Sequence, residues 1–406
     1  MARVIGMSAK FDLLSAGELF PGLQHDLLAL CFWHLPHASS NVRICAVGDI
    51  GLSGRVDPLV GRGGSGSVFA EIQPFFLKSN IVFGNLESPL VDAYVGKQMF
   101  AAATQGAVAL KAAGFTLLHL ANNHIHDFGA EGLQSTMDAC RAAGLLTLGA
   151  GRTMGEAGSL VVTEAGRMRI GWLGCGRTLI KQSQDGPCYW ELEEAQLMDA
   201  VAEARSKVDL LVVSLHIGLM YLDYPHPDHK ALAGRLQKAG AGIVLMHHPH
   251  VLQGVEVDDN GQTICYSLGN FVLDWQEGNV VNHIMVREQN ESAIFVFDVS
   301  QAGIVQAVAV PVHLDENLVV RWATGERGRE ILDRLARVSR EIQNDYTRLF
   351  ERQRAGRNAA PVFAVALHHM RKGNWRYLTE HISRFRLEHL RMFWLFFLDK
   401  LAGRDA

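Results

Sequence analysis

The sequence predicts an α/β protein that continues into a helical extension. Strand-like apolar runs alternate with amphipathic, helix-like stretches between residues 41 and 314, and apolar residues follow helical spacing from residue 326. Hydrophobic residues make up 48% of the 406 residues and charged residues 20%, which is typical of a globular chain with a large core. We therefore expect a helical segment at 1–40, an α/β domain at 41–314 and a helical extension at 326–406.

The N-terminal segment is expected to form a short helical element whose apolar part is residues 27–33. Charged residues and Pro21 interrupt its start, so it lacks the pattern of a signal peptide. The sequence has no apolar run of about 18 residues, the minimum for a transmembrane helix. The six cysteines are scattered without a C-x-x-C pair, which indicates buried thiols in a reducing compartment. Together these features predict a cytoplasmic protein.

The central segment is predicted from apolar runs that are rich in β-branched residues and separated by helical patterns. Residues 61–67 are rich in glycine, but they lack the lysine of a phosphate-binding P-loop and do not directly follow a strand, so we interpret them as an ordinary loop. The expected strands are residues 42–48, 80–85, 115–121, 168–174, 208–216, 241–247 and 263–270, and the expected helices are residues 130–143, 191–207 and 228–239.

The helical extension ends in a basic and aromatic stretch around Trp394. Such a stretch packs against the main domain or a second subunit, or lies on a membrane surface; we favour packing and leave the oligomeric state open. The formal net charge of −4 provides no overall attraction to nucleic acid or acidic membranes. An anionic substrate would therefore be held by local charge or by metal.

Polar side chains follow five successive strand-like runs at the point where each run ends. Each residue alone is more typical of a helix cap, a turn or an ordinary hydrogen-bonded histidine. Because the carboxyl ends of strands gather along one edge of an open sheet, we expect these side chains to converge. They are Asp49, Asn85, Glu87, Asn122, Asn123, His124, Asp127, His216, His247, His248 and His250.

Carboxylate, carboxamide and imidazole groups without thiolate suit Mn, Fe or Zn. The number of candidate ligands exceeds the needs of one tetrahedral ion, so we expect up to two ions. If two ions bind, a carboxylate would bridge them. His124 is a candidate general acid that Asp127 would orient.

The second histidine-rich turn contains a proline, Pro249, which is expected to hold its neighbours in an extended segment. His248 and His250 would then lie on the same side, and His247 would point away. His126, in the first turn, is expected to face solvent.

A series of motifs in order resembles the CapA family of poly-γ-glutamate capsule-synthesis proteins, a branch of the calcineurin-like metallophosphoesterase superfamily. The resemblance covers about residues 41–273 and implies a metallophosphatase-like α/β/β/α sandwich. The motifs are "VGDIGLSG", "FGNLESPL", "LANNHIHDFGAEGL", "LGAGR", "VVSLHIG", "HHPHVLQGVE" and "YSLGNF".

The resemblance also implies roles for individual residues. Six residues match metal-binding positions: Asp49, Glu87, Asn123, His216, His248 and His250. His124 matches the catalytic histidine, and Asn270 is similar to a family-specific polar group at the same edge. We expect Asn85 and Asn270 to contact the substrate. Four positions depart from the pattern. Gly51 replaces a histidine and Glu87 replaces an aspartate of the wider superfamily, and Met220 replaces a glutamate and Met246 a glycine that are usual in CapA-like proteins.

The predicted function is that of a metal-dependent hydrolase acting on a phosphoester or on a γ-glutamyl or peptide-type amide in polymer or peptide biosynthesis. Both chemistries develop negative charge that a metal pair stabilises. The expected partner is a small-molecule, peptide or polyglutamate-type anionic substrate. The alternatives are a non-catalytic capsule or polymer assembly protein, which uses the metal site for structure or polyanion binding, and an inactive fold without metal.

Overall fold

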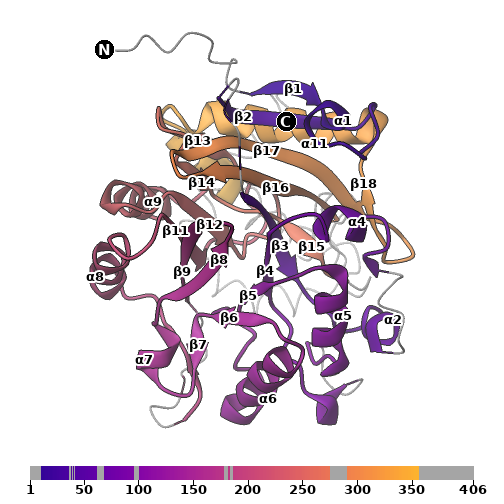
Figure 1. Cartoon of the computed structure of the whole chain (residues 1–406), viewed down its shortest axis with the longest axis vertical. Coiled ribbons are helices and arrows are strands. Elements are labelled where there is room, and N and C mark those ends of the chain that lie inside the picture. The colour runs from indigo at the N-terminus through magenta and orange to yellow at the C-terminus, as the bar shows by residue number, and fades with distance from the viewer. Residues whose placement is uncertain are drawn as a thin grey trace, which may run out of the picture.

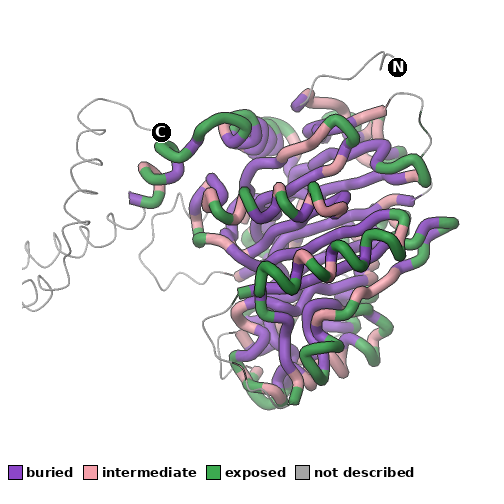
Figure 2. Tube along the Cα trace, turned by 90° about the vertical axis from the view of Figure 1, so that its left-hand side faces the viewer, coloured by how far each residue is buried: buried purple, intermediate pink, exposed green. Residues whose placement is uncertain are grey.

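The computed structural model describes residues 11–355 except 36–37, 39, 41, 62–67, 96–99, 178–181, 183–185 and 275–289. Two large sheets pack face to face, with helices on the outer face of each (Figure 1). The buried strands run through the interior, and the exposed residues concentrate on the outer helices (Figure 2). This arrangement confirms the predicted α/β/β/α sandwich.

The larger, ten-stranded sheet has the order β1-β2-β17-β16-β3-β4-β5-β6, and β15 pairs with β3 and β18 with β17. β3 to β6 and β15 are parallel, whereas β16, β17, β2 and β1 add antiparallel strands. The strands are β1 (Asp12–Ser15), β2 (Leu28–His34), β3 (Val42–Ile50), β4 (Ile81–Leu86), β5 (Leu117–His119), β6 (Leu146–Leu148), β15 (Asn270–Val272), β16 (Glu291–Ser300), β17 (Gly303–Leu314) and β18 (Val320–Trp322).

The second, six-stranded sheet has the order β13-β14-β12-β11-β9-β8 and is parallel at its centre. A short pair of strands, β7 and β10, lies outside both sheets. The strands are β8 (Val161–Ala165), β9 (Met168–Gly176), β11 (Leu210–His216), β12 (Ile243–His247), β13 (Val255–Val257), β14 (Thr263–Cys265), β7 (Ala150–Gly151) and β10 (Cys188–Tyr189).

The apolar core has three parts that follow from these layers. One part fills the space between the two sheets, where Phe83 of β4 stacks on Trp172 of β9 with ring centroids 5.3 Å apart. The other parts lie beneath the outer helices. The helices of the larger sheet are α1 (Ala16–Leu19), α2 (Asp57–Gly61), α4 (Gln73–Phe76), α5 (Gln105–Ala113) and α6 (Gly129–Ala142), and a short 3₁₀ helix, η1 (Asp92–Tyr94), precedes α5. The other sheet is covered by α7 (Met154–Ala157), α8 (Glu194–Ala204) and α9 (Pro227–Ala239).

The C-terminal helix α11 (Gly325–Glu341) packs on the same core as the sheets, because its Ile331 and Leu332 are fully buried between them. Residues 347–355 are helical as well. The basic and aromatic stretch around Trp394 and most of the glycine-rich residues 61–67 lie outside the described residues. Within the described part of the chain, none of the helices has the length and apolar character needed to cross a membrane.

Two predictions of secondary structure are wrong. Residues 27–33 were expected to be helical, but they form most of β2, which pairs with β17. Both faces of this strand are buried, so its sequence is a continuous apolar run, and such a run has no periodicity that separates strand from helix. Residues 263–270 were expected to form one strand, but they divide between β14 in one sheet and the start of β15 in the other.

This crossing between sheets depends on two glycines. Gly269 has a φ of 70°, a conformation that side chains disfavour. A Cβ on Gly48 of β3 would lie 1.8 Å from the Gly269 carbonyl oxygen, so the two backbones touch. The crossing places Asn270 directly beside Asp49, at the edge where the predicted site residues lie.

Candidate metal centre

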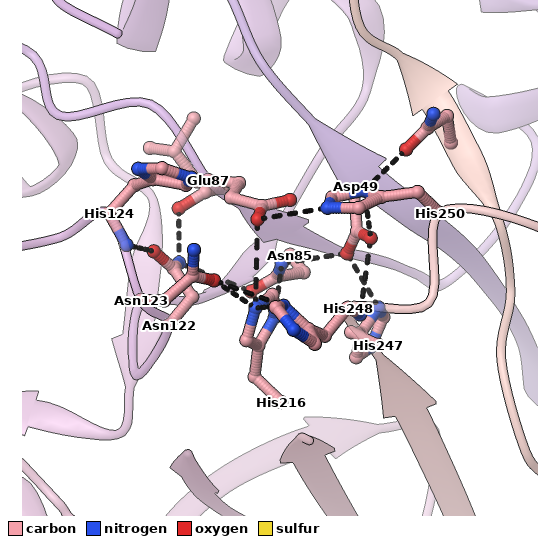
Figure 3. A network of polar contacts seen from close by, with 12 residues as sticks. Asp49, Asn85, Glu87, Asn122, Asn123, His124, His216, His247, His248 and His250 are labelled. Carbon is pink, nitrogen blue, oxygen red and sulfur yellow. Dashed lines mark hydrogen bonds and ion pairs between the residues drawn. The ribbon is translucent and has the colours of Figure 1, made fainter. Parts of the chain in front are cut away.

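The predicted metal-binding side chains converge at the carboxyl ends of β3, β4, β11 and β12 and in the turn after β5 (Figure 3). Two groups of side chains offer ligand atoms that lie within 4.8 Å of one another: Glu87, His216 and His248, and Asp49, Glu87 and His250. Glu87 belongs to both groups. The structure therefore brings the residues together in the arrangement expected for two ions that share one carboxylate.

Glu87 lies at the centre of this arrangement, with its Oε1 3.6 Å from His216 Nε2 and 3.7 Å from His250 Nε2 (Figure 3). The residue is 1% exposed, and neither carboxylate oxygen has a hydrogen-bond partner within the described residues. Burial raises the pKa of Glu87 well above its usual value. A buried carboxylate without a hydrogen-bond donor is costly unless a cation compensates it, so this group fits a bridging metal ligand.

The first group is completed by an amide oxygen. Asn123 Oδ1 lies 2.6 Å from His216 Nε2 and 3.2 Å from His248 Nδ1. Burial and neighbouring histidines lower the pKa of His216 well below its usual value and that of His248 to about 4. Both imidazoles are therefore neutral near pH 7, which is the form that binds metal.

Asp49 is fully buried at the end of β3 and is surrounded by donors. It accepts hydrogen bonds from Asn85 Nδ2 at 2.8 Å and from the backbone N–H of His248 at 3.3 Å. Burial opposes ionisation, but contacts with His247 and His250 outweigh it and hold the pKa of Asp49 well below its usual value. The second group therefore contains a carboxylate that is ionised near neutral pH.

His250 is oriented by Asn270, whose Oδ1 lies 2.9 Å from His250 Nδ1. Because an amide oxygen only accepts, Nδ1 carries the hydrogen and Nε2 faces Glu87. Burial favours the neutral ring, but the carboxylates of Glu87 and Asp49 and the Asn270 contact raise the pKa of His250 to about 9. In the absence of an ion, His250 thus holds the positive charge that these carboxylates require.

His124 and Asp127 have the predicted mutual geometry, with His124 Nδ1 2.9 Å from Asp127 Oδ2. His124 directly follows Asn123, its backbone N–H donates to Asn122 Oδ1 at 3.2 Å, and its side chain is 21% exposed (Figure 3). One residue here was missed by the sequence: Phe100 stacks on the His124 ring, with centroids 3.7 Å apart. Phe100 lies outside the motifs, and no signal in the sequence connects it to His124.

The expected geometry of the second histidine turn is wrong. The turn is not extended, because His248 has a φ of 97° and His250 a φ of 60°. Such conformations cost about 1–3 kcal/mol each and persist where surrounding contacts hold them. Those contacts are the hydrogen bond from His248 N–H to Asp49 and the 2.7 Å bond from Tyr221 N–H to the Pro249 carbonyl.

Two histidines lie elsewhere than expected. His247 was expected to point away, but it is fully buried with Nδ1 3.3 Å from Asp49 Oδ1, and its ring is 6.2 Å from that of the buried His119. His126 was expected to face solvent, but it is 7% exposed and contacts the Pro187 carbonyl. His119, the last residue of β5, contacts Ser214 Oγ at 2.7 Å; it was not singled out because the strand predicted at residues 115–121 placed it before the strand end.

Two of the departures from the family pattern, Gly51 and Met220, have different structural settings. A Cβ on Gly51 would lie 2.2 Å from Leu273 Cδ1, so Leu273 fills the space that a larger residue would need. Met220 is 49% exposed, next to Tyr221, whose ring is 6.1 Å from that of His250. The space beside Gly51 is closed, whereas the Met220 position is open to solvent.

The fold and the site define a two-sheet α/β/β/α protein with a candidate metal centre at its strand ends. The family model described as bacterial capsule synthesis protein PGA_cap matches residues 43–275, and the chain belongs to this family. Capsule biosynthesis protein CapA of Bacillus anthracis is 32% identical over 70% of this chain and 74% of its own length. PGA biosynthesis protein CapA of Bacillus subtilis is 29% identical over 66% of this chain and 73% of its own.

The chain also resembles solved structures. A structure described as a novel phosphatase from Mycoplasma pneumoniae superposes with a TM-score of 0.43 at 13% identity, covering 77% of this chain and 100% of that one. A calcineurin-like phosphoesterase, YfkN of Bacillus subtilis, gives a TM-score of 0.35 at 9% identity over 75% and 98% of the two chains.

Proposed function

We propose that this protein is a metal-dependent hydrolase of polymer or peptide biosynthesis, with a substrate that is a phosphoester or a γ-glutamyl or peptide-type amide. The observation that carries the proposal is the buried carboxylate of Glu87, which lacks a hydrogen-bond partner within the described residues and lies between imidazoles of two ligand groups. The names of the two Bacillus relatives support a role in capsule or polyglutamate synthesis.

Two transition-metal ions, such as Mn, Fe or Zn, fit the donors. Asn123, His216 and His248 would hold one ion and Asp49 and His250 the other, with Glu87 between them. When bound, the ions supply Lewis-acid chemistry that activates water and stabilises negative charge on the substrate. The second position has fewer donors, because Gly51 offers none, so we expect its ion to bind more weakly.

His124 would hold the proton that the leaving group receives. Asp127 accepts the hydrogen of Nδ1, so the proton for transfer is carried by Nε2. The 21% exposure of His124 leaves this edge open to a substrate.

Asn85 and Asn270 are better placed to position ligands than to contact substrate. Asn85 is fully buried, donates to Asp49 and lies 3.1 Å from His216 Nδ1, and Asn270 is 3% exposed beside His250. We therefore assign both to orienting the ligands, as is common for the polar residues behind metal-binding histidines and carboxylates.

The second candidate is a non-catalytic assembly protein that uses the metal site for structure or to bind a polyanion. It is favoured by Met220, an exposed thioether where CapA-like proteins usually carry a glutamate. For both candidates we propose a reducing, cytoplasmic location, because all six cysteines are buried and unpaired.

Hydrolysis assays on metal-loaded protein test the proposal, with diphenyl phosphate and γ-glutamyl-p-nitroanilide as substrates, because both leaving groups require protonation. We expect the parent chain to turn over one of them, His124→Ala to lose at least about 100-fold in kcat while keeping its metal, and His248→Ala to lose metal and activity together. His25→Ala, at an exposed position, is the matched control. Retained metal without turnover of either substrate would favour the assembly protein.

A further inference from the structure

Phe100 covers one face of the His124 ring. The two ring centroids are 3.7 Å apart and the planes are inclined by 24°, which is close stacking of an aromatic ring on an imidazole. Asp127 binds the same imidazole in its plane, through Nδ1 at 2.9 Å. The in-plane hydrogen bond sets the direction of the ring edge, and the stacked ring fixes its tilt, so together they fix the direction of Nε2.

The backbone next to Phe100 is held firmly in place. Ala102 N–H donates to the Pro89 carbonyl at 3.0 Å, and the Ala102 carbonyl accepts from Val91 N–H at 2.8 Å. The backbone N–H of Ala103 donates to Asp57 Oδ1 at 2.6 Å. Because Ala102 is also fully buried, the segment after Phe100 is anchored to the body of the protein.

We propose that Phe100 is a positioning residue for the reaction, which holds the His124 imidazole in the orientation that presents its Nε2 proton to the leaving group. This inference rests on the proposed function of His124 and adds a residue that none of the sequence motifs contains. Phe100 acts through His124, since its ring contacts the imidazole and has no donor or acceptor of its own.

Two substrates that differ in their leaving group can distinguish a role of Phe100 in proton transfer from a role in packing alone. A poor leaving group such as phenolate requires protonation, whereas p-nitrophenolate departs with little assistance. In Phe100→Leu, we expect kcat for diphenyl phosphate to fall about tenfold and kcat for bis-p-nitrophenyl phosphate to change less than about twofold, because only proton transfer depends on the ring orientation. Metal content should be unchanged, and Phe100→Tyr should restore the parent values.

Tyr94→Leu is the matched control. Tyr94 stacks on Phe128 at 4.7 Å, so this change removes a neighbouring aromatic pair without touching His124. It should leave both rates unchanged. Equal loss on both esters in Phe100→Leu, or the same loss in Tyr94→Leu, would overturn the inference.

A second readout does not depend on turnover, and it separates failure of this inference from failure of the proposed function. In ¹⁵N spectra of protein labelled at its histidines, the His124 resonance is identified as the one that is missing from His124→Ala. This resonance reports the Nδ1–H that is bound to Asp127. We expect this resonance to be broadened or lost through solvent exchange in Phe100→Leu and kept in Phe100→Tyr and Tyr94→Leu. An unchanged resonance in Phe100→Leu would show that Phe100 does not position the ring, whether or not the esters are hydrolysed.

Discussion

The closed space at Gly51 leads to a prediction about coupling with Leu273. In Gly51→Ala the new methyl group would lie 2.2 Å from Leu273 Cδ1 but 3.6 Å from its Cγ, so a single terminal methyl group causes the clash. Leu273 is 5% exposed and cannot simply turn into solvent. We expect Gly51→Ala to lower the free energy of unfolding by about 1–3 kcal/mol, the usual cost of overpacking.

Leu273→Ala should lower the free energy of unfolding by about 2–5 kcal/mol, because this substitution removes buried methyl groups and leaves a cavity. In the double variant the added methyl group meets no Cδ1 and partly fills the cavity. We expect the double variant to be more stable than the sum of the single effects by about 1–2 kcal/mol, within the range of coupling for residues in contact.

Denaturant unfolding of the four metal-free proteins measures this coupling directly. Effects that add within about 0.5 kcal/mol would show that Gly51 and Leu273 do not compete for the same space, and would refute the reasoning. Gly51→His in the Leu273→Ala background extends the test to metal binding. Only with Leu273 shortened is a histidine at this position expected to fit and strengthen binding of the second ion.

Three further predictions concern the ligands and their supports. His250 must lose a proton to bind metal, and its pKa of about 9 lies above neutral pH. Binding should therefore release a proton below pH 9, so Mn²⁺ affinity measured by calorimetry should rise roughly 50-fold from pH 7 to pH 9, and equal affinities would contradict this. Asn270→Leu should weaken metal binding about 10- to 100-fold by removing the acceptor for His250 Nδ1, whereas Asn260→Leu, at an exposed turn, should have no effect. Asp127→Asn should reduce kcat with metal content unchanged; a loss of metal in this variant would instead place Asp127 among the ligand supports.

The sequence predicted the position of the site well, because that position depends on strand ends. Polar residues after apolar runs define where β3, β4, β5, β11 and β12 end, and parallel strands bring those ends to one edge. The contact between His124 and Asp127 was predictable for a similar reason, since three residues in one turn fix their separation.

Other features depend on contacts between distant segments, which no local pattern records. The left-handed backbone at His248 is held by Asp49, far away in the sequence, so the extended bias before Pro249 was overridden. The contact of Asn270 with His250 arises because the chain crosses between sheets at Gly269. Phe100 reaches His124 only in the folded chain.

The central claim is that Glu87 joins two ion-binding groups, and metal titration of the parent chain and Glu87→Gln tests it most directly. Burial already raises the pKa of Glu87, so the neutral glutamine is expected to fold. We predict that the parent chain binds two equivalents of Mn²⁺ and that Glu87→Gln loses affinity for both, with His25→Ala unchanged. A folded parent chain that binds no metal, or a Glu87→Gln variant that binds two ions as tightly as the parent, would contradict the claim.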